Sequence, residues 1–395
     1  MQLSERVRWI KPSATLAVTE KAAALRRQGI QVIDLGAGEP DFDTPENIKE
    51  AARRALAAGQ TKYTPVGGTD ELKSAIVTKL ARDNGLEYAK NEVIASCGGK
   101  HALFVLFQAL FNEGDEVLVP APYWVSYPDM LLLAGARARI VFPKAGNSFK
   151  LAPEDLDAAL TPRTKAIILN SPSNPAGVAY SPEELAALLD VIAQHSCWII
   201  SDDVYEKMVY GDFQLGQVLR LRPDLRPRTI LCNSVSKTYA MTGWRVGYTA
   251  GPAEVIRAMT TLQGQMTSNP SSIAQAAAAE ALAGNQDSVP RMMAEFGKRR
   301  DFVVERLQAI PGIHCPKPQG AFYVFPNVSA YLGKGSGPKT GDELAAYLIE
   351  KTHVAVVGGT DFGYPDHIRI SYANSIENLQ EGLDRIARAL AELGR

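Results

Sequence analysis

The sequence predicts an α/β fold: a large domain whose mostly parallel sheet is sandwiched by helices, and a smaller α+β domain. Two observations carry this prediction. Six short runs are apolar almost throughout and end in turn residues, and helix-like stretches separate several of them. Strands that are buried on both faces and alternate with helices are typical of a parallel sheet that helices cover on both sides.

Local signals place the helices and strands of the large domain. Thr44, Thr69 and Ser181 each stand where an N-cap is expected, and Gly59 and Gly85 are expected to end the first two helices. The six strand-like runs cover residues 92–96, 115–122, 165–172, 197–203, 229–236 and 246–251. Ligands bind beyond the carboxyl ends of the strands in such sheets, so the residues that follow each run are candidates for a site.

The C-terminal third has a different pattern. A long helical stretch with charged faces leads to the short strand-like runs "GAFYVFP" and "HIRISYA", and an amphipathic helix closes the chain. This order predicts the smaller α+β domain. We expect residues 1–44 to form an N-terminal arm and part of the small domain, residues 45–289 the large domain, and residues 290–395 the small C-terminal domain.

Composition excludes several classes of function. The formal net charge is −1, so no basic excess indicates a nucleic-acid partner. No apolar run reaches the ~18 residues of a membrane span, and the N-terminus lacks the apolar region of a secretory signal, so we expect a cytoplasmic protein. The cysteines are far apart and form no CxxC pair, which argues against a zinc site or a disulfide framework; they are Cys97, Cys197, Cys232 and Cys315.

Three strand ends carry uncharged candidates for ligand binding. Gly98 and Gly99 precede a helix, so free backbone N–H groups and the positive helix end could hold an anion; a tight turn without a ligand is the alternative. Trp124 either packs or stacks on a flat aromatic ligand. Asn174, in "SPSNPAG", is either a loop residue or a fixed amide donor beside a ligand.

The next strand end carries a carboxylate. Asp202 stands where an apolar strand ends, and a buried carboxylate is costly unless it is paired. The alternative is a helix N-cap, a role that Asp203 could fill equally well. Tyr205 follows at a spacing that could bring its hydroxyl to the same spot.

A lysine follows the fifth strand, within "SVSKTYAMTGWRVGY". Lys237 is flanked by Ser234 and Ser236, and Arg245 lies shortly downstream. This grouping suits an anion, a covalent bond to a cofactor, or neither. Nearby cations and burial are expected to lower the pKa of Lys237, because both disfavour its charged form.

Taken together, these groups fit pyridoxal 5′-phosphate. A lysine forms a Schiff base with the aldehyde of this cofactor, and a carboxylate keeps its pyridine nitrogen protonated so that the ring accepts electrons. An aromatic face stacks on the ring, and a helix N-terminus with hydroxyl and arginine donors takes the phosphate. We therefore expect this cofactor, attached to Lys237.

The sequence also resembles a known family: the fold type I pyridoxal-phosphate enzymes, specifically class I aminotransferases of the bacterial aspartate aminotransferase branch. Ten matching segments run in order over nearly the whole chain, and they are "KPSATLAV", "GAGEPDFDTP", "TKYTPVGGTDEL", "GGKHALF", "PYWVSYP", "NSPSNPAG", "SDDVYE", "SVSKTYAMTGWRVGY", "GAFYVFP" and "HIRISYA". The resemblance implies amino-group transfer between amino acids and 2-oxo acids by a ping-pong mechanism, in a homodimer with shared active sites.

The resemblance also implies a role for individual residues. Lys237 is the implied catalytic residue. The implied cofactor contacts are Gly99, Lys100, Trp124, Asn174, Asp202, Tyr205, Ser234, Ser236, Lys237 and Arg245, and Tyr63 is expected to reach the phosphate in the partner subunit. The implied substrate contacts are Gly38, Trp124, Asn174, Arg369, Lys100, Lys11 and Thr15.

Substrate choice depends on the cations. Arg369 is expected to bind the α-carboxylate as a bidentate pair, and Gly38 lets the backbone approach it. The resemblance implies that Lys100 binds a second carboxylate, although it could instead complete the phosphate site or be solvated. The resemblance further implies that members of the branch that use prephenate have Lys100 together with Lys11 and Thr15. We expect aspartate aminotransferase activity, with prephenate as a further substrate.

Other functions are weighed against this one. An aromatic or kynurenine aminotransferase or a β-lyase shares the scaffold and differs in the distal pocket, so Lys100 discriminates. A cofactor-binding regulator carries an added DNA-binding segment, and this chain starts almost at once with the arm of the family. A dinucleotide-binding dehydrogenase needs a G-x-G-x-x-G turn after a strand near the start, which is missing. His101 stands where Gln often follows the lysine of "GGK", and the resemblance implies no role for it.

Overall fold

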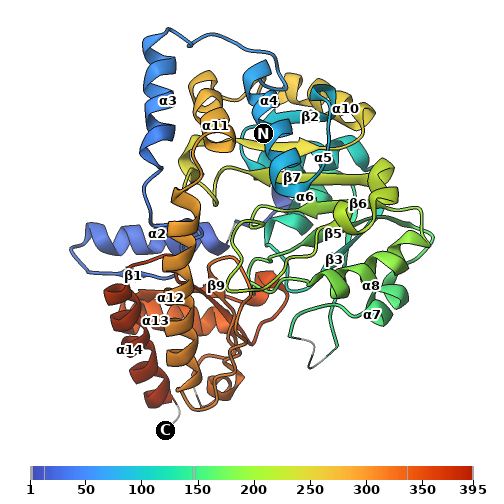
Figure 1. The fold of residues 1–395 in the computed structure, drawn as a ribbon. Helices are drawn as coiled ribbons and strands as arrows, with labels where there is room; N and C mark the ends of the chain where they lie inside the picture. The colour runs from blue at the N-terminus through green and yellow to red at the C-terminus, as the bar shows by residue number, and fades with distance from the viewer. Residues whose placement is uncertain (1–2, 13, 145, 147, 336, 394–395) are drawn as a thin grey trace.

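A computed structural model describes residues 3–12, 14–144, 146, 148–335 and 337–393, with the side chains of 14–16 excepted (Figure 1). Its centre is a seven-stranded sheet in the order β2-β8-β7-β6-β5-β3-β4. The strands are β2 Val93–Ser96, β3 Glu116–Pro120, β4 Arg137–Val141, β5 Thr164–Asn170, β6 Trp198–Asp202, β7 Thr229–Ser234 and β8 Gly247–Ala250. All neighbours from β4 to β7 pair in parallel, and β8 runs antiparallel to β2 and β7. The predicted mostly parallel sheet is confirmed.

The register brings the polar strand ends to one edge of the sheet. Asn170 at the end of β5 is level with Asp202 on β6, and Asp202 is level with Cys232 on β7. Because these strands are parallel, the residues that follow them emerge side by side. The six predicted strands are all present, whereas the edge strand β4 was not predicted.

Helices cover both faces of this sheet (Figure 1). The α-helices of this part are α3 Glu46–Ala57, α4 Asp70–Lys79, α5 Gly99–Leu110, α6 Ser126–Leu133, α7 Pro153–Ala159, α8 Pro182–Ala193, α9 Val218–Leu221, α10 Ala253–Met266 and α11 Ser272–Ala283. Side chains of α5 and α10 share one apolar core with alternate strand residues, and those of α4, α8 and α11 share another. Burial on both faces explains why the strand sequences are apolar throughout.

Two of the three predicted N-caps are confirmed. The Thr69 hydroxyl accepts a hydrogen bond from the backbone N–H of Leu72, and Ser181 forms a capping box at the start of α8. The prediction for Thr44 is wrong, because α3 begins after Pro45. The Thr44 hydroxyl instead donates to the carbonyl of Ala240 at 2.6 Å, since tertiary contacts there outweigh the local cap.

The C-terminal third shares an apolar core with residues from the start of the chain and with Tyr205, Met208 and Tyr210, which follow β6. Its elements are α12 Ser288–Gln308, β9 Tyr323–Val324, α13 Gly341–Thr352, β10 Val354–Ala355, β11 Val357–Gly358, β12 Ile368–Ser371 and α14 Ile376–Leu393. An antiparallel sheet joins β11, β12 and β9. The strand β1, Ile33–Asp34, pairs with β10 and so fastens the segment after α2, Ala14–Arg27, to this part of the fold. A short α1 spans Arg6–Trp9. Within the described residues, no helix is long and apolar enough to cross a membrane.

Candidate active site

A cavity of about 560 Å³ lies at the carboxyl edge of the sheet, where β5, β6 and β7 end. Segments from both parts of the fold line it, including Gly38 before α3 and Arg369 on β12. Of the predicted site residues, the cavity brings together Gly38, Gly99, Lys100, Trp124, Asn174, Asp202, Tyr205, Ser234, Ser236, Lys237, Arg245 and Arg369. The cavity therefore lies at the edge of the sheet where ligands are expected to bind in such folds.

A buried carboxylate forms the floor of the cavity. Asp202 Oδ2 accepts a hydrogen bond from the Tyr127 hydroxyl at 2.5 Å, and Oδ1 accepts from the backbone N–H of Val204 at 3.4 Å. Burial raises the pKa of Asp202 to about 6, and these two hydrogen bonds only partly oppose the shift. No helix starts after Asp202, so the N-cap alternative is wrong. Such a carboxylate suits a cationic partner in the cavity.

The predicted lysine reaches across the cavity. Lys237 Nζ donates a hydrogen bond to the backbone carbonyl of Gly38, which comes from the segment after β1. The pKa of Lys237 is lowered to about 8, mainly by burial and also by the charges of Arg369 and Arg245, while Glu39 opposes the shift. The direction agrees with the prediction, and the neutral amine is therefore accessible near physiological pH.

An anion cup lies at the start of α5. The backbone of Gly98 has φ +94°, and a Cβ there would lie 2.3 Å from Arg245 Nη2, so only glycine fits. Arg245 donates to the carbonyls of Thr242 at 2.8 Å and Cys97 at 3.4 Å. Ser234 Oγ accepts from the backbone N–H of Ser236 at 3.3 Å. Hydroxyl groups, a guanidinium and a helix N-terminus thus converge on one end of the cavity.

A buried arginine forms the opposite wall. Arg369 is 2% exposed; its Nη1 donates to Asn174 Oδ1 at 2.9 Å, and its Nη2 donates to the carbonyl of Gly36 at 2.7 Å. Its Nε has no hydrogen-bond partner among the described residues. A buried guanidinium that still has an unpaired N–H is prepared to bind a further acceptor.

Two tyrosines complete the wall beside the arginine. The hydroxyls of Tyr205 and Tyr323 lie 3.0 Å apart, and the guanidinium carbon of Arg369 lies 4.5 Å from the centre of the Tyr323 ring. A Cβ at Gly38 would lie 3.2 Å from the Tyr323 hydroxyl. Tyr323 and Tyr127 were not predicted. Each lies in a quoted segment, "GAFYVFP" or "PYWVSYP", but an aromatic residue there gave no sign of which side it faces.

The remaining wall is flat and cationic. Lys100 Nζ lies 5.2 Å from the centre of the Trp124 ring, and Trp124 packs edge-on against Tyr127 at 5.4 Å between ring centres. The pKa of Lys100 is lowered by partial removal from water and by the charge of Arg245. An indole face and an ammonium group therefore face the same cavity.

Two of the predicted residues do not join the cavity. Tyr63 is 90% exposed, and Lys11 is exposed as well; neither lines the cavity of its own chain. Thr15 lies outside the residues whose side chains are described.

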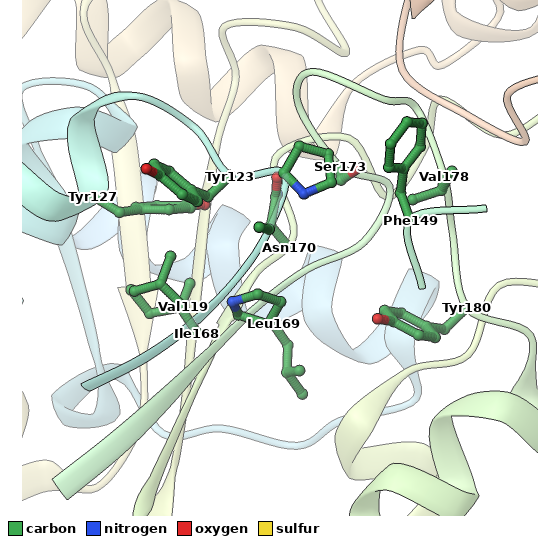
Figure 2. A pocket seen from close by; sticks show the side chains of 13 residues that line it. Val119, Tyr123, Tyr127, Phe149, Ile168, Leu169, Asn170, Ser173, Val178 and Tyr180 are labelled. Atoms are coloured by element: carbon green, nitrogen blue, oxygen red, sulfur yellow. The ribbon is translucent and has the colours of Figure 1, made fainter. Parts of the chain in front are cut away.

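A second, much smaller cavity shares two lining residues with the site (Figure 2). Its volume is about 30 Å³, and Tyr127 and Asn170 line both cavities. The hydroxyl of Ser173 lines it too and has no hydrogen-bond partner within the part of the chain that is described. The space suits one or two waters rather than an organic ligand, so the larger cavity is the candidate site.

The donor set of the large cavity fits pyridoxal 5′-phosphate. The anion cup suits a phosphate, Asp202 suits a protonated pyridine nitrogen, and Trp124 offers a flat face. Lys237 supplies an amine with a lowered pKa. This fold and this site define a pyridoxal-phosphate enzyme of fold type I.

Comparisons with known proteins narrow the class. The family model "Aminotransferase class I and II" matches residues 30–386, so the chain belongs to the class I and II aminotransferase family, and it is a pyridoxal-phosphate-dependent aminotransferase. It is 53% identical to an aspartate/prephenate aminotransferase of Cereibacter sphaeroides, over 99% of each chain. It is 50% identical to an aspartate aminotransferase of Geobacillus stearothermophilus, over 98% of each chain.

Solved structures agree with these matches. A crystal structure of the aspartate aminotransferase from Rhizobium meliloti is similar with a TM-score of 0.94 and 47% identity, covering 99% of each chain. The aspartate aminotransferase of Thermus thermophilus with maleate has a TM-score of 0.92 and 45% identity, covering 98% of this chain and 99% of that one.

Proposed function

We propose that this aminotransferase moves an amino group between a dicarboxylic amino acid, aspartate or glutamate, and a 2-oxo acid such as 2-oxoglutarate or oxaloacetate. The observation that carries the proposal is the pair of cations in one cavity: Arg369 on β12 and Lys100 on α5. Two carboxylates on one substrate need two cations. The names of the relatives support this choice, and the similar structure with maleate holds a dicarboxylate.

In this proposal the chain holds the cofactor at both ends. The start of α5, Ser236 and Arg245 hold the phosphate, and Asp202 holds a proton on the pyridine nitrogen. When bound, pyridoxal phosphate supplies an aldehyde that amines can bond and a ring that accepts electrons from the substrate Cα. The Asn174 amide nitrogen is left free to donate to the ring oxygen, because its Oδ1 already accepts from Arg369.

Lys237 then moves protons. Its pKa of about 8 leaves part of the population neutral at neutral pH, so its Nζ can take a proton from the substrate Cα and return it elsewhere. Arg369 orients the substrate, because its unpaired Nε and an Nη group can bind the α-carboxylate while the rest of the guanidinium stays fixed by Asn174 and Gly36. Closure of the C-terminal part over the substrate would exclude water.

We further propose that the active unit is a homodimer. Tyr63 is almost fully exposed on one chain although it lies in a segment that matches the family. In a dimer it would reach the phosphate in the partner subunit. Sedimentation of the loaded protein and of Tyr63→Phe, with cofactor affinity measured on both, tests this: weaker cofactor binding with an unchanged dimer is expected.

Prephenate is a second proposed substrate. The relative from Cereibacter sphaeroides is named an aspartate/prephenate aminotransferase. The resemblance noted in the sequence implies that Lys11, Thr15 and Lys100 accompany use of prephenate. Amino transfer from glutamate to prephenate, followed by product analysis, tests the proposal directly. Absence of product with an active enzyme would leave the dicarboxylate proposal in place and remove this one.

Half-reactions with single amino acids test the main proposal. The loaded protein is mixed with aspartate, glutamate, alanine or phenylalanine, and the absorbance of the bound cofactor is followed. Fast conversion by the two dicarboxylic amino acids is expected, and Lys100→Ala should slow only these two. The exposed Lys165 serves as the matched control, and Lys165→Ala should change nothing. Equal rates with all four amino acids would contradict the substrate assignment but not the transaminase.

A further inference from the structure

His101 accepts a hydrogen bond from the backbone just before α5, and its position in the first turn of that helix explains the contact. It is the third residue of α5, after Gly99 and Lys100, and its Nδ1 accepts a hydrogen bond from the backbone N–H of Cys97 at 3.2 Å. In a capping box, a Glu or Gln side chain at this third position reaches back to a backbone N–H before the helix. His101 makes the same kind of backward contact with a ring nitrogen.

The turn before the helix is held from its other side as well. The carbonyl of Cys97 accepts from Arg245 Nη2 at 3.4 Å, and Gly98 leaves room for that guanidinium. The N–H and the C=O of Cys97 are thus bonded by two different side chains. The first backbone bond within the helix is donated by Ala102 to the carbonyl of Gly98 at 3.0 Å.

This arrangement controls where the free N–H groups point. In the described part of the chain, the N–H groups of Gly99 and Lys100 have no acceptor, as expected for the first turn of a helix, and both residues line the large cavity. A shift of Cys97 would tilt these donors, because only Gly98 separates it from them. An anion held by such donors depends on their direction.

The ring must be neutral to act in this way. Nδ1 accepts a hydrogen bond only when the hydrogen sits on Nε2, and Nε2 is buried without a partner among the residues described. Burial and the charge of Arg245 both lower the pKa of His101, which keeps the ring neutral. The charge of Arg245 near the ring therefore disfavours its protonation.

We propose that His101 is a positioning residue for the cofactor phosphate: by fixing Cys97 it aims the N–H groups of Gly99 and Lys100 at the anion. The inference rests on the proposed role of this helix start in holding pyridoxal phosphate. It predicts that a side chain with an acceptor at the same reach replaces His101, and that a side chain without one does not.

Two ligands and two substitutions test the inference. The cofactor is removed from the wild type, His101→Ala and His101→Gln, and each protein is titrated with pyridoxal 5′-phosphate and with pyridoxal, which lacks the phosphate. His195→Ala is the matched control, because His195 is half-buried and does not line the cavity. Thermal unfolding of each cofactor-free protein shows whether the variant folds.

Loss of one hydrogen bond in the turn should weaken the affinity of His101→Ala for pyridoxal phosphate by about fivefold. Its affinity for pyridoxal should be unchanged, and His101→Gln should bind both ligands like the wild type. Equal loss for both ligands, or no loss in His101→Ala, would overturn the inference while leaving the cofactor assignment intact. A wild type that binds neither ligand would overturn both. If His101→Ala does not fold, a failure of His101→Gln to bind pyridoxal phosphate normally decides against the inference.

Discussion

Arg369 and Asn174 are 195 residues apart in the chain, yet Nη1 of the arginine donates to Oδ1 of the asparagine at 2.9 Å. The bond joins β12 of the C-terminal part to the loop after β5 of the large sheet. It also sets both partners for their proposed roles, since it fixes the guanidinium plane and leaves the asparagine amide to donate. Arg369 and Asn174, which line the same cavity from two different parts of the chain, therefore hold each other in position.

Arg369→Lys should lose most of the activity. An ammonium group cannot reproduce the planar fork that meets Asn174, Gly36 and a carboxylate together, so kcat/KM for every amino acid should fall roughly 100-fold. Cofactor affinity should stay within about twofold, because the phosphate cup is at the other end of the cavity. Steady-state kinetics and cofactor titration measure the two effects; an equal loss in cofactor affinity would contradict the assignment.

Asp202→Asn should stabilise the cofactor-free protein at high pH. The pKa of Asp202 is raised from 3.8 to about 6. At pH values between these two, the folded state therefore binds more protons than the unfolded state. Stability therefore falls as the pH rises through this range, and above it the full cost of the buried charge remains. The asparagine carries no charge and still accepts from Tyr127. We expect a gain of roughly 3 kcal/mol at about pH 8 and little gain at about pH 4.

Urea unfolding of the cofactor-free proteins at both pH values measures this difference. The loaded variant should lose activity by several orders of magnitude, since nothing holds the proton on the pyridine nitrogen. A variant that is less stable than the wild type at the higher pH would show that Asp202 is not a destabilising charge in the cofactor-free fold.

Lys237 should react with amine reagents at lower pH than other lysines. Its pKa of about 8 predicts a labelling midpoint near that value in the cofactor-free protein. Glu39→Gln should move the midpoint lower, because Glu39 raises this pKa. Peptide mapping after timed labelling gives the midpoint for Lys237 and for the exposed Lys165 in the same sample. An unchanged midpoint in Glu39→Gln would exclude the electrostatic explanation.

Glu206→Gln should be strongly destabilising. The Glu206 carboxylate accepts hydrogen bonds from Lys79, from Asn84 at 2.6 Å and from Asn233 at 2.7 Å. The side chains of Lys79 and Glu206 are only 3% and 5% exposed, so removing one charge strands the other. A loss of roughly 3 kcal/mol is expected, and Lys79→Met combined with Glu206→Gln should recover part of it. Equal losses in the single and double variants would show that the charges do not interact.

Much of the fold could be predicted because its signals are local. Strands buried on both faces leave unbroken apolar runs, and Thr69 and Ser181 cap helices through bonds that span three residues. The edge strand β4 escaped prediction because its sequence, "RARIV", is interrupted by two arginines and only its last residue, Val141, is buried. Thr44 was misassigned because its hydroxyl bonds to Ala240, a contact that local sequence cannot reveal.

The site was predictable where charge meets an apolar strand end, as at Asp202 and Lys237. It was not predictable where the partner is a backbone carbonyl or another aromatic residue. Gly36 accepts from Arg369 through its main chain, and Tyr323 differs from its neighbour Phe322 only in a hydroxyl that finds Tyr205 in the folded protein. Such contacts depend on tertiary structure and leave no periodic signal.

The hydrogen-bond acceptors of Arg369 and Lys237 have a consequence for how the sequence of this enzyme can diverge during evolution. Arg369 and Lys237 both donate to main-chain carbonyls, those of Gly36 and Gly38. A substitution replaces a side chain but leaves the main-chain carbonyl in place. These two contacts therefore persist as long as the backbone keeps the same path. The indole and ammonium wall formed by Trp124 and Lys100 has no such protection. Divergence of substrate range should therefore accumulate on that wall, while recognition of the amino-acid end persists.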